Sequence, residues 1–247
     1  MAETIRVNHQ IGYLLNTRPW KESSLLIDIF TQDYGKKILI ARGARKATSA
    51  LRGVLNPFTP ISFSWFGKNS LLTLHQASWI GGQPMPQGIA LLSSWYINEL
   101  VFKLVPPNDP HPKIFIGLKT SMLALANNQD PSSQLRKFEW ILLNELGLAP
   151  SILVDIYENP IKKNHFYQVK YESNLIPIYS EKPHIDHFVT VSGETLININ
   201  REDYTLEKTR QEAREFFQYL IAQHIPNHQI VSSHILKQLF QSTLLIN

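Results

Sequence analysis

Apolar and polar residues follow two different periods along the chain, and the change falls near residue 80. Before that point, runs of β-branched and aromatic residues predict five strands, at residues 9–15, 24–30, 36–42, 59–66 and 71–78. Turn-forming residues separate these runs, at Arg18-Pro19, Asp33-Tyr34-Gly35, Asn56-Pro57 and Gly67-Lys68-Asn69-Ser70. Residues 47–55 are long enough for a short helix. Five short strands with an insert after the third are typical of an OB-type barrel, although SH3-like barrels also have five strands.

The segment Gly81-Gly82-Gln83-Pro84-Met85-Pro86 breaks the strand pattern and indicates a domain boundary. Beyond it, apolar residues at steps of three and four predict helices at residues 89–104, 114–127, 132–146, 207–222 and 233–241. Candidate strands at residues 166–171 and 188–191 lie in an irregular stretch. The sequence therefore predicts an α+β protein. We expect a five-stranded OB-fold β-barrel over residues 1–80, then a mostly α-helical domain over residues 84–247 with a partly β insert around residues 155–205.

Positive charge is concentrated in the predicted barrel. Residues 1–80 carry ten Lys and Arg against four Asp and Glu, a net charge of +6, whereas the rest of the chain has a net charge of −2. No acidic residue occurs between Asp33 and Glu99, and seven basic residues fall in that window. Such an electrostatic footprint is typical of proteins that bind a polyanion, nucleic acid above all.

The most basic stretch runs from Lys36 to Lys46, along the third predicted strand and the turn after it. Gly43 in that turn allows a positive φ and a close backbone approach to a ligand. We predict that six cations of this region contact phosphates: Lys36, Lys37, Arg42, Arg45, Lys46 and Arg52. Four aromatic residues are candidate stacking surfaces for bases: Trp20, Trp65, Phe66 and Trp79. The alternatives are a solvated hairpin tip for the cations and core packing for each aromatic ring.

Several kinds of chemistry are excluded by the residues present. The chain has no cysteine, so disulfides, thiolate zinc sites, iron–sulfur clusters and cysteine nucleophiles are ruled out. His184 and His187, with His165 nearby, lack the spacing of zinc ligands. Phosphate-loop, dinucleotide-binding and nucleophile-elbow motifs do not occur, so we predict no metal, no cofactor and no enzymatic activity. Without an apolar stretch of membrane-spanning length or a signal-peptide core, we expect a cytoplasmic protein.

Short motifs follow one another through the predicted barrel: Arg18-Pro19, Glu22-Ser23-Ser24-Leu25-Leu26, Phe30-Thr31, Ala41-Arg42-Gly43-Ala44-Arg45 and Pro57-Phe58-Thr59. In this order they resemble the N-terminal domain of the RecO family of bacterial recombination mediators. The likeness continues in the helical part, at Tyr96-Ile97-Asn98-Glu99-Leu100 and Leu135-Arg136-Lys137-Phe138-Glu139. It is weak over residues 155–205.

The resemblance implies an OB-fold followed by a mostly helical domain, and a function in recombinational DNA repair. RecO proteins bind single- and double-stranded DNA, anneal complementary strands, interact with RecR, and help RecA replace single-strand binding protein on DNA. Many relatives carry a four-cysteine zinc module, which a chain without cysteine cannot form. An RNA-binding OB-fold protein of translation or ribosome assembly has the same charge pattern, and only the resemblance separates it. A metal-dependent nuclease would need clustered carboxylates, and the acid-free window between Asp33 and Glu99 argues against such a site in the barrel.

The resemblance also implies a receptor for the C-terminal tail of single-strand binding protein, which is acidic and ends in apolar residues. A receptor of this kind combines a hydrophobic pocket with one or two cations, preferably Arg. Four consecutive residues of one predicted helix supply that mixture: Leu135, Arg136, Lys137 and Phe138. The alternative is that Leu135 and Phe138 are core residues and the two cations are solvated.

Overall fold

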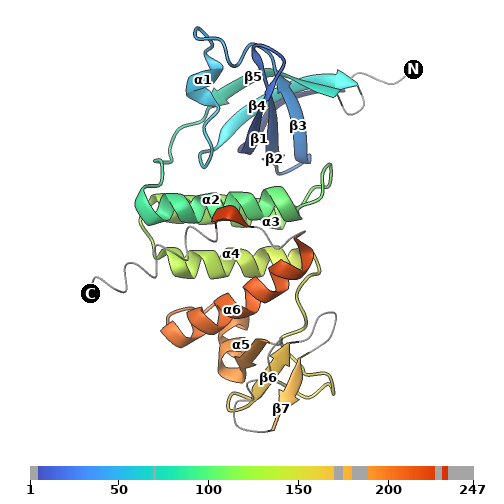
Figure 1. Ribbon diagram of the computed structural model, residues 1–247, viewed down its shortest axis with the longest axis vertical. Helices are drawn as coiled ribbons and strands as arrows, with labels where there is room; N and C mark the ends of the chain where they lie inside the picture. Colours follow the sequence, from blue (N-terminus) through green and yellow to red (C-terminus); the bar gives the residue numbers. More distant parts are fainter. Residues whose placement is uncertain (1–4, 69–70, 170–174, 180–188, 226–229, 233–247) are drawn as a thin grey trace. The chain divides into compact units, whose positions relative to one another are not determined.

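The computed structural model describes residues 5–68, 71–169, 175–179, 189–225 and 230–232 (Figure 1). Its contacts divide the chain into two compact units. Unit 1 comprises Met1–Gln129 and Ile230–Asn247, and unit 2 comprises Asp130–Gln229. Two helices of the region that follows the strands thus belong to the same unit as the strands. The predicted domain division between residues 80 and 84 stays a prediction.

Unit 1 contains a closed barrel of five strands in the order β1-β2-β3-β5-β4. The strands are β1 (Ile5–Trp20), β2 (Ser24–Thr31), β3 (Gly35–Ala41), β4 (Ile61–Lys68) and β5 (Leu71–Trp79). All pairs are antiparallel except β3 with β5, which is parallel. The short helix α1 (Leu51–Val54) lies between β3 and β4. This order with an insert after the third strand confirms the predicted OB-fold.

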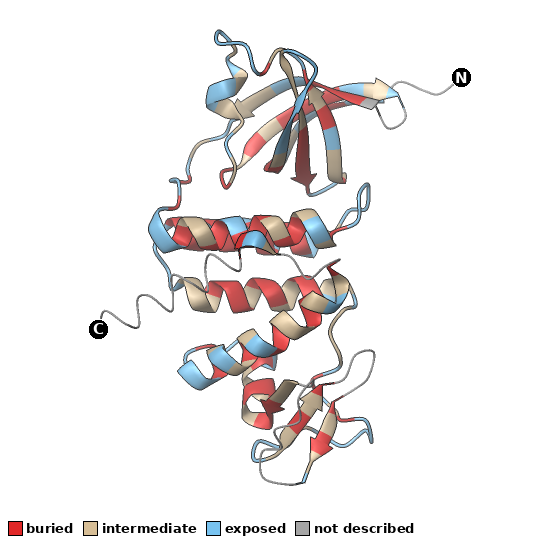
Figure 2. Ribbon diagram, in the orientation of Figure 1, coloured by how far each residue is buried: buried red, intermediate tan, exposed pale blue. Residues whose placement is uncertain are grey.

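The barrel encloses a core of β-branched, aliphatic and aromatic side chains. Figure 2 shows the buried residues of the barrel strands in red. Ile27 and Ile29 of β2 and Phe63 of β4 are fully buried, and each such side chain contributes about 1.5–3 kcal/mol through its removal from water. Trp65 is also buried and packs edge-on against Tyr34, with ring centroids 5.3 Å apart. Trp65 is therefore a core residue and offers no surface to a base.

The end of β1 differs from the expected position of the first turn. Arg18-Pro19 does not end the first strand, because β1 continues to Trp20 and Pro19 pairs with Leu25. Proline is tolerated there since β1 pairs with β4 only as far as Gly12, so no second neighbour needs its missing N–H group. Asp28 of β2 is buried, and Arg18 Nη2 lies 3.3 Å from its carboxylate.

Besides the barrel, α1 and the short segment 230–232, the described part of unit 1 contains two helices. They are α2 (Gly88–Leu104) and α3 (Pro112–Ala126), close to the predicted bounds. Asn98 of α2 donates from Nδ2 to the backbone oxygen of Leu15 over 2.7 Å, which ties α2 to β1. The α2–α3 connection contacts the β2–β3 turn, where the Asn108 N–H donates to the Lys36 carbonyl over 2.9 Å. These bonds fix the barrel against α2 within unit 1.

Unit 2 combines helices with a small sheet. Its elements are α4 (Pro131–Glu145), β6 (Phe166–Val169), β7 (Ile176–Ile178), β8 (Val189–Ser192), α5 (Gly193–Asn200) and α6 (Glu207–His224). The sheet order is β7-β6-β8 and both pairs are antiparallel. Asp130 caps α4 by accepting the Ser133 N–H over 2.9 Å, and Gly147, at φ 68°, follows its last turn.

The sequence analysis missed two elements of unit 2, β7 and α5. β7 has only three residues and α5 has eight, so both are shorter than the stretch over which a strand or helix pattern can be recognised. Ser192 marks the start of α5 as an N-cap, since its hydroxyl accepts the Thr195 N–H. The predicted helix at residues 233–241 lies outside the described residues. Among the described helices, none has the length and apolar character needed to cross a lipid bilayer.

Candidate nucleic-acid interface

Strand β3 separates the six predicted phosphate ligands into two groups. Lys36 and Lys37 lie near its first residue, and Arg42 follows its last. Arg42 follows Lys36 by six positions of extended chain, which corresponds to about 20 Å. One phosphate cluster cannot include both ends of the strand.

The first group, Lys36 and Lys37, makes contacts within unit 1. The Lys36 ammonium donates to the Phe102 carbonyl over 2.7 Å and lies 5.6 Å from the centre of the Phe102 ring. The Lys37 ammonium donates to Asn108 Oδ1 over 2.9 Å. Burial lowers the pKa of both lysines, and the negative charge of Asp28 offsets part of this effect at Lys36. Both ammonium groups thus already serve the contact between the barrel and the α2–α3 region.

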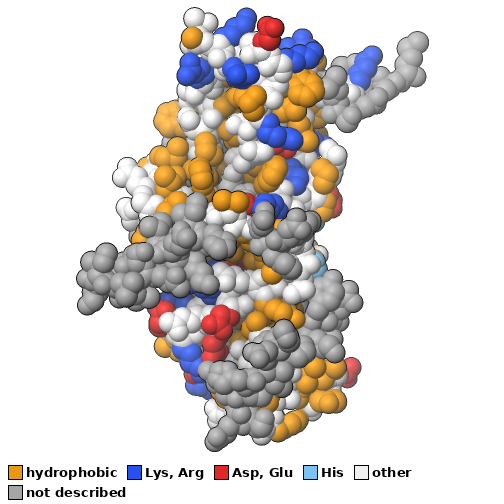
Figure 3. Space-filling model, in the orientation of Figure 1, with side chains coloured by type: hydrophobic (Ala, Val, Ile, Leu, Met, Phe, Trp, Pro, Cys, Tyr) orange, Lys and Arg blue, Asp and Glu red, His pale blue; other side chains and the backbone are white. Residues whose placement is uncertain are grey.

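The second group lies beyond β3 and is exposed. We call it the turn cluster: Arg42, Arg45, Lys46 and Arg52. Within the part of the chain that the structure describes, none of these side chains forms an ion pair with an acid. Figure 3 shows Lys and Arg side chains gathered over the barrel region of unit 1. The turn cluster therefore presents uncompensated positive charge to solvent.

Two surface hollows adjoin the turn cluster. The larger, of about 610 Å³, contains an exposed indole and three cations among its lining residues: Trp20, Lys21, Ser23, Ser24, Ile40, Arg42, Gly43 and Lys46. We call it the Trp20 hollow. The second, of about 370 Å³, is lined in part by Arg45 and Arg52. The sequence analysis missed Lys21 as a site residue, because only the pairing of β2 with β3, which joins Leu25 to Ala41, brings its turn beside the end of β3.

The four candidate stacking residues differ in how far their side chains are exposed to solvent. Trp65 is in the core, as described above, whereas three aromatic side chains are exposed: Trp20 at 39%, Phe66 at 40% and Trp79 at 62%. Trp20 lines the hollow that also contains Arg42 and Lys46. Phe66 lies on β4 beside His75, with ring centroids 6.2 Å apart. Aromatic surface and positive charge therefore meet at Trp20.

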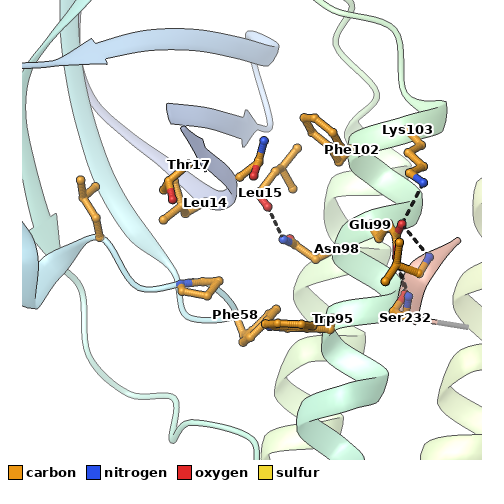
Figure 4. A pocket seen from close by; sticks show the side chains of 14 residues that line it. Leu14, Leu15, Thr17, Phe58, Trp95, Asn98, Glu99, Phe102, Lys103 and Ser232 are labelled. Atoms are coloured by element: carbon orange, nitrogen blue, oxygen red, sulfur yellow. Dashed lines mark hydrogen bonds and ion pairs between the residues drawn. The ribbon is translucent and has the colours of Figure 1, made fainter. Parts of the chain in front are cut away.

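A separate groove of about 520 Å³ lies between β1 and α2 (Figure 4). Leu14, Phe58 and Trp95 form part of its apolar wall. Its acidic group, Glu99, accepts hydrogen bonds from Lys103 and from the N–H groups of Val231 and Ser232. Burial alone would raise the pKa of Glu99, but these bonds and that from the Ser232 hydroxyl lower it below its ordinary value. Apolar walls and an ionised carboxylate make this groove unsuitable for phosphates.

The four residues predicted to bind a partner lie on α4 in unit 2. Leu135 and Phe138 are buried, and the Arg136 side chain is only 4% exposed. Arg136 donates from Nε and Nη2 to the two carboxylate oxygens of Glu139, over 2.5 and 2.7 Å. Lys137 alone of the four is partly exposed. Lys137 is thus the member of the set that another molecule can reach on the surface of this structure.

A zinc site like the four-cysteine module of some relatives does not fit the residues present. The chain has no cysteine, and the described residues contain no group of three His, Asp or Glu side chains that could hold a metal ion. His184 and His187 lie outside the described residues. The His165 ring contacts the ring of Tyr179, with centroids 6.3 Å apart.

Comparison with known proteins gives the same family over both halves of the chain. Residues 5–83 match the family model "Recombination protein O N terminal", and residues 85–234 match "Recombination protein O C terminal". The chain belongs to the RecO family of DNA repair proteins. The expected family is therefore confirmed, and the barrel is the OB-fold domain of that family.

Individual relatives cover almost the whole chain. The DNA repair protein RecO of Neisseria meningitidis strain FAM18 is 39% identical over 232 residues, which are 92% of this chain and 88% of that protein. The DNA repair protein RecO of Azoarcus sp. strain BH72 is 33% identical over 242 residues, 98% of this chain and 100% of that protein. That of Dechloromonas aromatica is 35% identical over 243 residues. These names state a role in DNA repair and no catalytic activity, and the alternative of a translation protein is not favoured.

Proposed function

We propose that this protein is a DNA-binding recombination mediator that binds single- and double-stranded DNA through its barrel. In this function it anneals complementary strands and, together with RecR, helps load RecA onto DNA coated by single-strand binding protein. It acts in the cytoplasm without catalysing a reaction of its own. The observation that carries the proposal is the turn cluster, an exposed group of cations at one end of an OB-fold barrel that form no ion pair with an acid among the described residues.

The proposal assigns the phosphate contacts to the turn cluster and not equally to all six predicted cations. Arg42, Lys46 and Arg52 are free to neutralise phosphates and to release counterions from the DNA. Arg45 is also part of a hydrogen bond within the barrel, since its Nη1 donates to the Lys21 carbonyl over 3.2 Å. Lys36 and Lys37 are the weaker candidates, because binding DNA would require them to leave Phe102 and Asn108.

The triple variant Arg42→Ala/Lys46→Ala/Arg52→Ala tests this assignment. Each phosphate neutralised on single-stranded DNA contributes about −0.7 to the slope of log K against log salt concentration, so the slope should become less negative by about 2. Affinity should fall to a similar degree for all DNA sequences, because phosphate contacts carry no sequence information. The measurement is fluorescence anisotropy of a labelled oligonucleotide titrated at several salt concentrations.

The matched control is Lys162→Ala/Lys163→Ala/Lys208→Ala, which removes the same charge from exposed lysines of unit 2. Its salt slope should stay close to that of the unchanged protein. If the turn-cluster variant folds and keeps its full slope while the control loses it, the DNA-binding face lies in unit 2.

We further propose that α4 contributes to binding the acidic C-terminal tail of single-strand binding protein, with Lys137 as the accessible cation. The charge reversal Lys137→Glu should weaken binding of a tail peptide about 1.5- to 5-fold, the range for losing one partly solvated ion pair. DNA affinity should be unchanged, because the turn cluster is untouched. Anisotropy of a labelled tail peptide measures the effect, with Lys162→Glu as the control for a general change of charge. Full tail binding by Lys137→Glu would remove α4 from the proposed site.

A further inference from the structure

The Trp20 hollow combines features that phosphate binding alone does not require. The exposed indole of Trp20 shares one hollow with Arg42 and Lys46, whose side chains form no ion pair among the described residues. We propose that Trp20 stacks on an unpaired base while these two cations hold the neighbouring phosphates. The inference rests on the proposed DNA-binding function and names the substrate that this part of the barrel selects, an unpaired strand in preference to a duplex.

The space beside the indole is open. Trp20 pairs across the β1–β2 hairpin with Ser24, a small residue, and Ser23 also lines the hollow. Gly43 adds no side chain, and a Cβ built on it would come no closer than 3.8 Å to the Lys46 side chain. A planar ring can therefore approach Trp20 without displacing other groups. Glu22 lies in the same turn, but it is not among the residues that line the hollow.

Hydrogen bonds hold the two walls of the hollow together before any ligand binds. The Arg45 N–H donates to the Ser23 carbonyl over 2.9 Å, and Arg45 Nη1 donates to the Lys21 carbonyl over 3.2 Å. These bonds join the β1–β2 turn, which directly follows Trp20, to the segment that carries Arg42 and Lys46. Because the walls are already fixed, binding a base costs less conformational entropy. Arg45 is thus a positioning residue for this site.

The strand register extends the site towards a second exposed aromatic ring. Ile40, which lines the hollow, pairs with Thr73 of β5, and Thr73 pairs with Phe66 of β4. Paired residues of neighbouring strands point to the same face, so the exposed Phe66 lies two strands from Ile40, about 10 Å away. A single strand that leaves Trp20 and crosses β2, β3 and β5 would meet this ring next.

The chemistry of stacking decides between an unpaired strand and a duplex. A base in a duplex is paired and stacked on both faces, so its ring cannot lie against the indole without being extruded. An unpaired base can lie against the indole without extrusion, and any of the bases can stack on an aromatic side chain. The cations serve both forms of DNA. The preference for single strands therefore depends on Trp20 and not on Arg42 or Lys46.

The test compares an oligothymidine of about 12 nucleotides, within the range of OB-fold site sizes, with an abasic strand of equal length and charge. Anisotropy gives the affinities of the unchanged protein and of Trp20→Leu at one salt concentration. The preference for oligothymidine over the abasic strand should fall about 5- to 150-fold in Trp20→Leu, and affinity for the abasic strand should not change. Trp79→Leu is the matched control, because Trp79 is also exposed but does not line the hollow.

The outcomes separate this inference from the proposed function. If the unchanged protein binds neither strand, the proposed DNA binding itself is wrong. If it binds both strands but Trp20→Leu keeps the full preference, or loses affinity for both equally, DNA binding stands and base stacking on Trp20 is wrong. Should Trp20→Leu fail to fold, Trp20→Phe decides: its smaller ring should give an intermediate preference, and an unchanged one overturns the inference.

Discussion

Replacing Arg136 by alanine should lower the free energy of unfolding by about 3–5 kcal/mol, the cost of removing one partner from a buried ion pair. Both side chains are almost completely enclosed, at 4% exposed for Arg136 and 0% for Glu139. The paired hydrogen bonds are lost together, and the carboxylate loses the nearby cation. Urea-induced unfolding followed by far-ultraviolet circular dichroism measures the change.

The double variant Arg136→Met/Glu139→Leu is the control for this prediction. It removes both charges and keeps a similar volume, so most of the stability should return. A loss below about 1 kcal/mol for Arg136→Ala would contradict the buried pair, since that is the range of solvent-exposed pairs. Burial and then the charge of Glu139 raise the pKa of the neighbouring Tyr204, while the charge of Arg136 lowers it.

This pair also changes how tail binding on α4 can be tested. A charge reversal at Arg136 would place two negative groups together in the interior, so the loss of tail binding could follow from unfolding alone. Lys137 is next to Arg136 in sequence but partly exposed. Substitution at Lys137 therefore reports on the partner contact without breaking the interior of unit 2.

The second large effect is expected at the β2–β3 turn, where Gly35→Ala should cost about 2–5 kcal/mol. Gly35 has φ 63°, a conformation that costs an L-residue about 1–2 kcal/mol. A Cβ there would lie 2.2 Å from the Asp109 carbonyl oxygen, and overpacking of this kind adds about 1–3 kcal/mol. Urea unfolding again measures the loss. The substitution should also loosen the contact that holds Lys36 and Lys37.

Substitutions at two other glycines of unit 1 distinguish the cost of backbone strain from the cost of overpacking. Gly82 has φ 79° and no atom within 4 Å of a built Cβ, so Gly82→Ala should show the backbone strain alone. Gly53 lies in α1 with no such contact, so Gly53→Ala should be neutral or stabilising by about 0.5–1 kcal/mol. If Gly35→Ala lowered the free energy of unfolding no more than Gly82→Ala does, the predicted overpacking against Asp109 would be wrong. The segment around Asp109 would then move aside without losing its packing.

Much of the fold follows from local patterns in the sequence. The runs of β-branched and aromatic residues predict five strands, and apolar steps of three and four predict α2, α3, α4 and α6, because burial of one face imposes those periods. The shortest elements, β7 and α5, escape this reasoning. At Arg18-Pro19 the local turn pattern is overridden by pairing of β1 with β2. The RecO family is identified from the motifs in residues 17–59, and the comparisons confirm it.

The sequence by itself determined that positive charge gathers in an OB-fold barrel without cysteine, since charge and composition need no folding to be counted. Only the tertiary structure decided which cations are free. Lys36 and Lys37 bond to residues 66 and 71 positions away in the chain, and no local pattern encodes partners at such separations. The positions of Trp65 and Trp20, two tryptophans of one barrel, likewise depend on the tertiary structure. Strand pairing and closure place the first in the core and leave the second beside Arg42, in a hollow formed by turns that are distant in sequence.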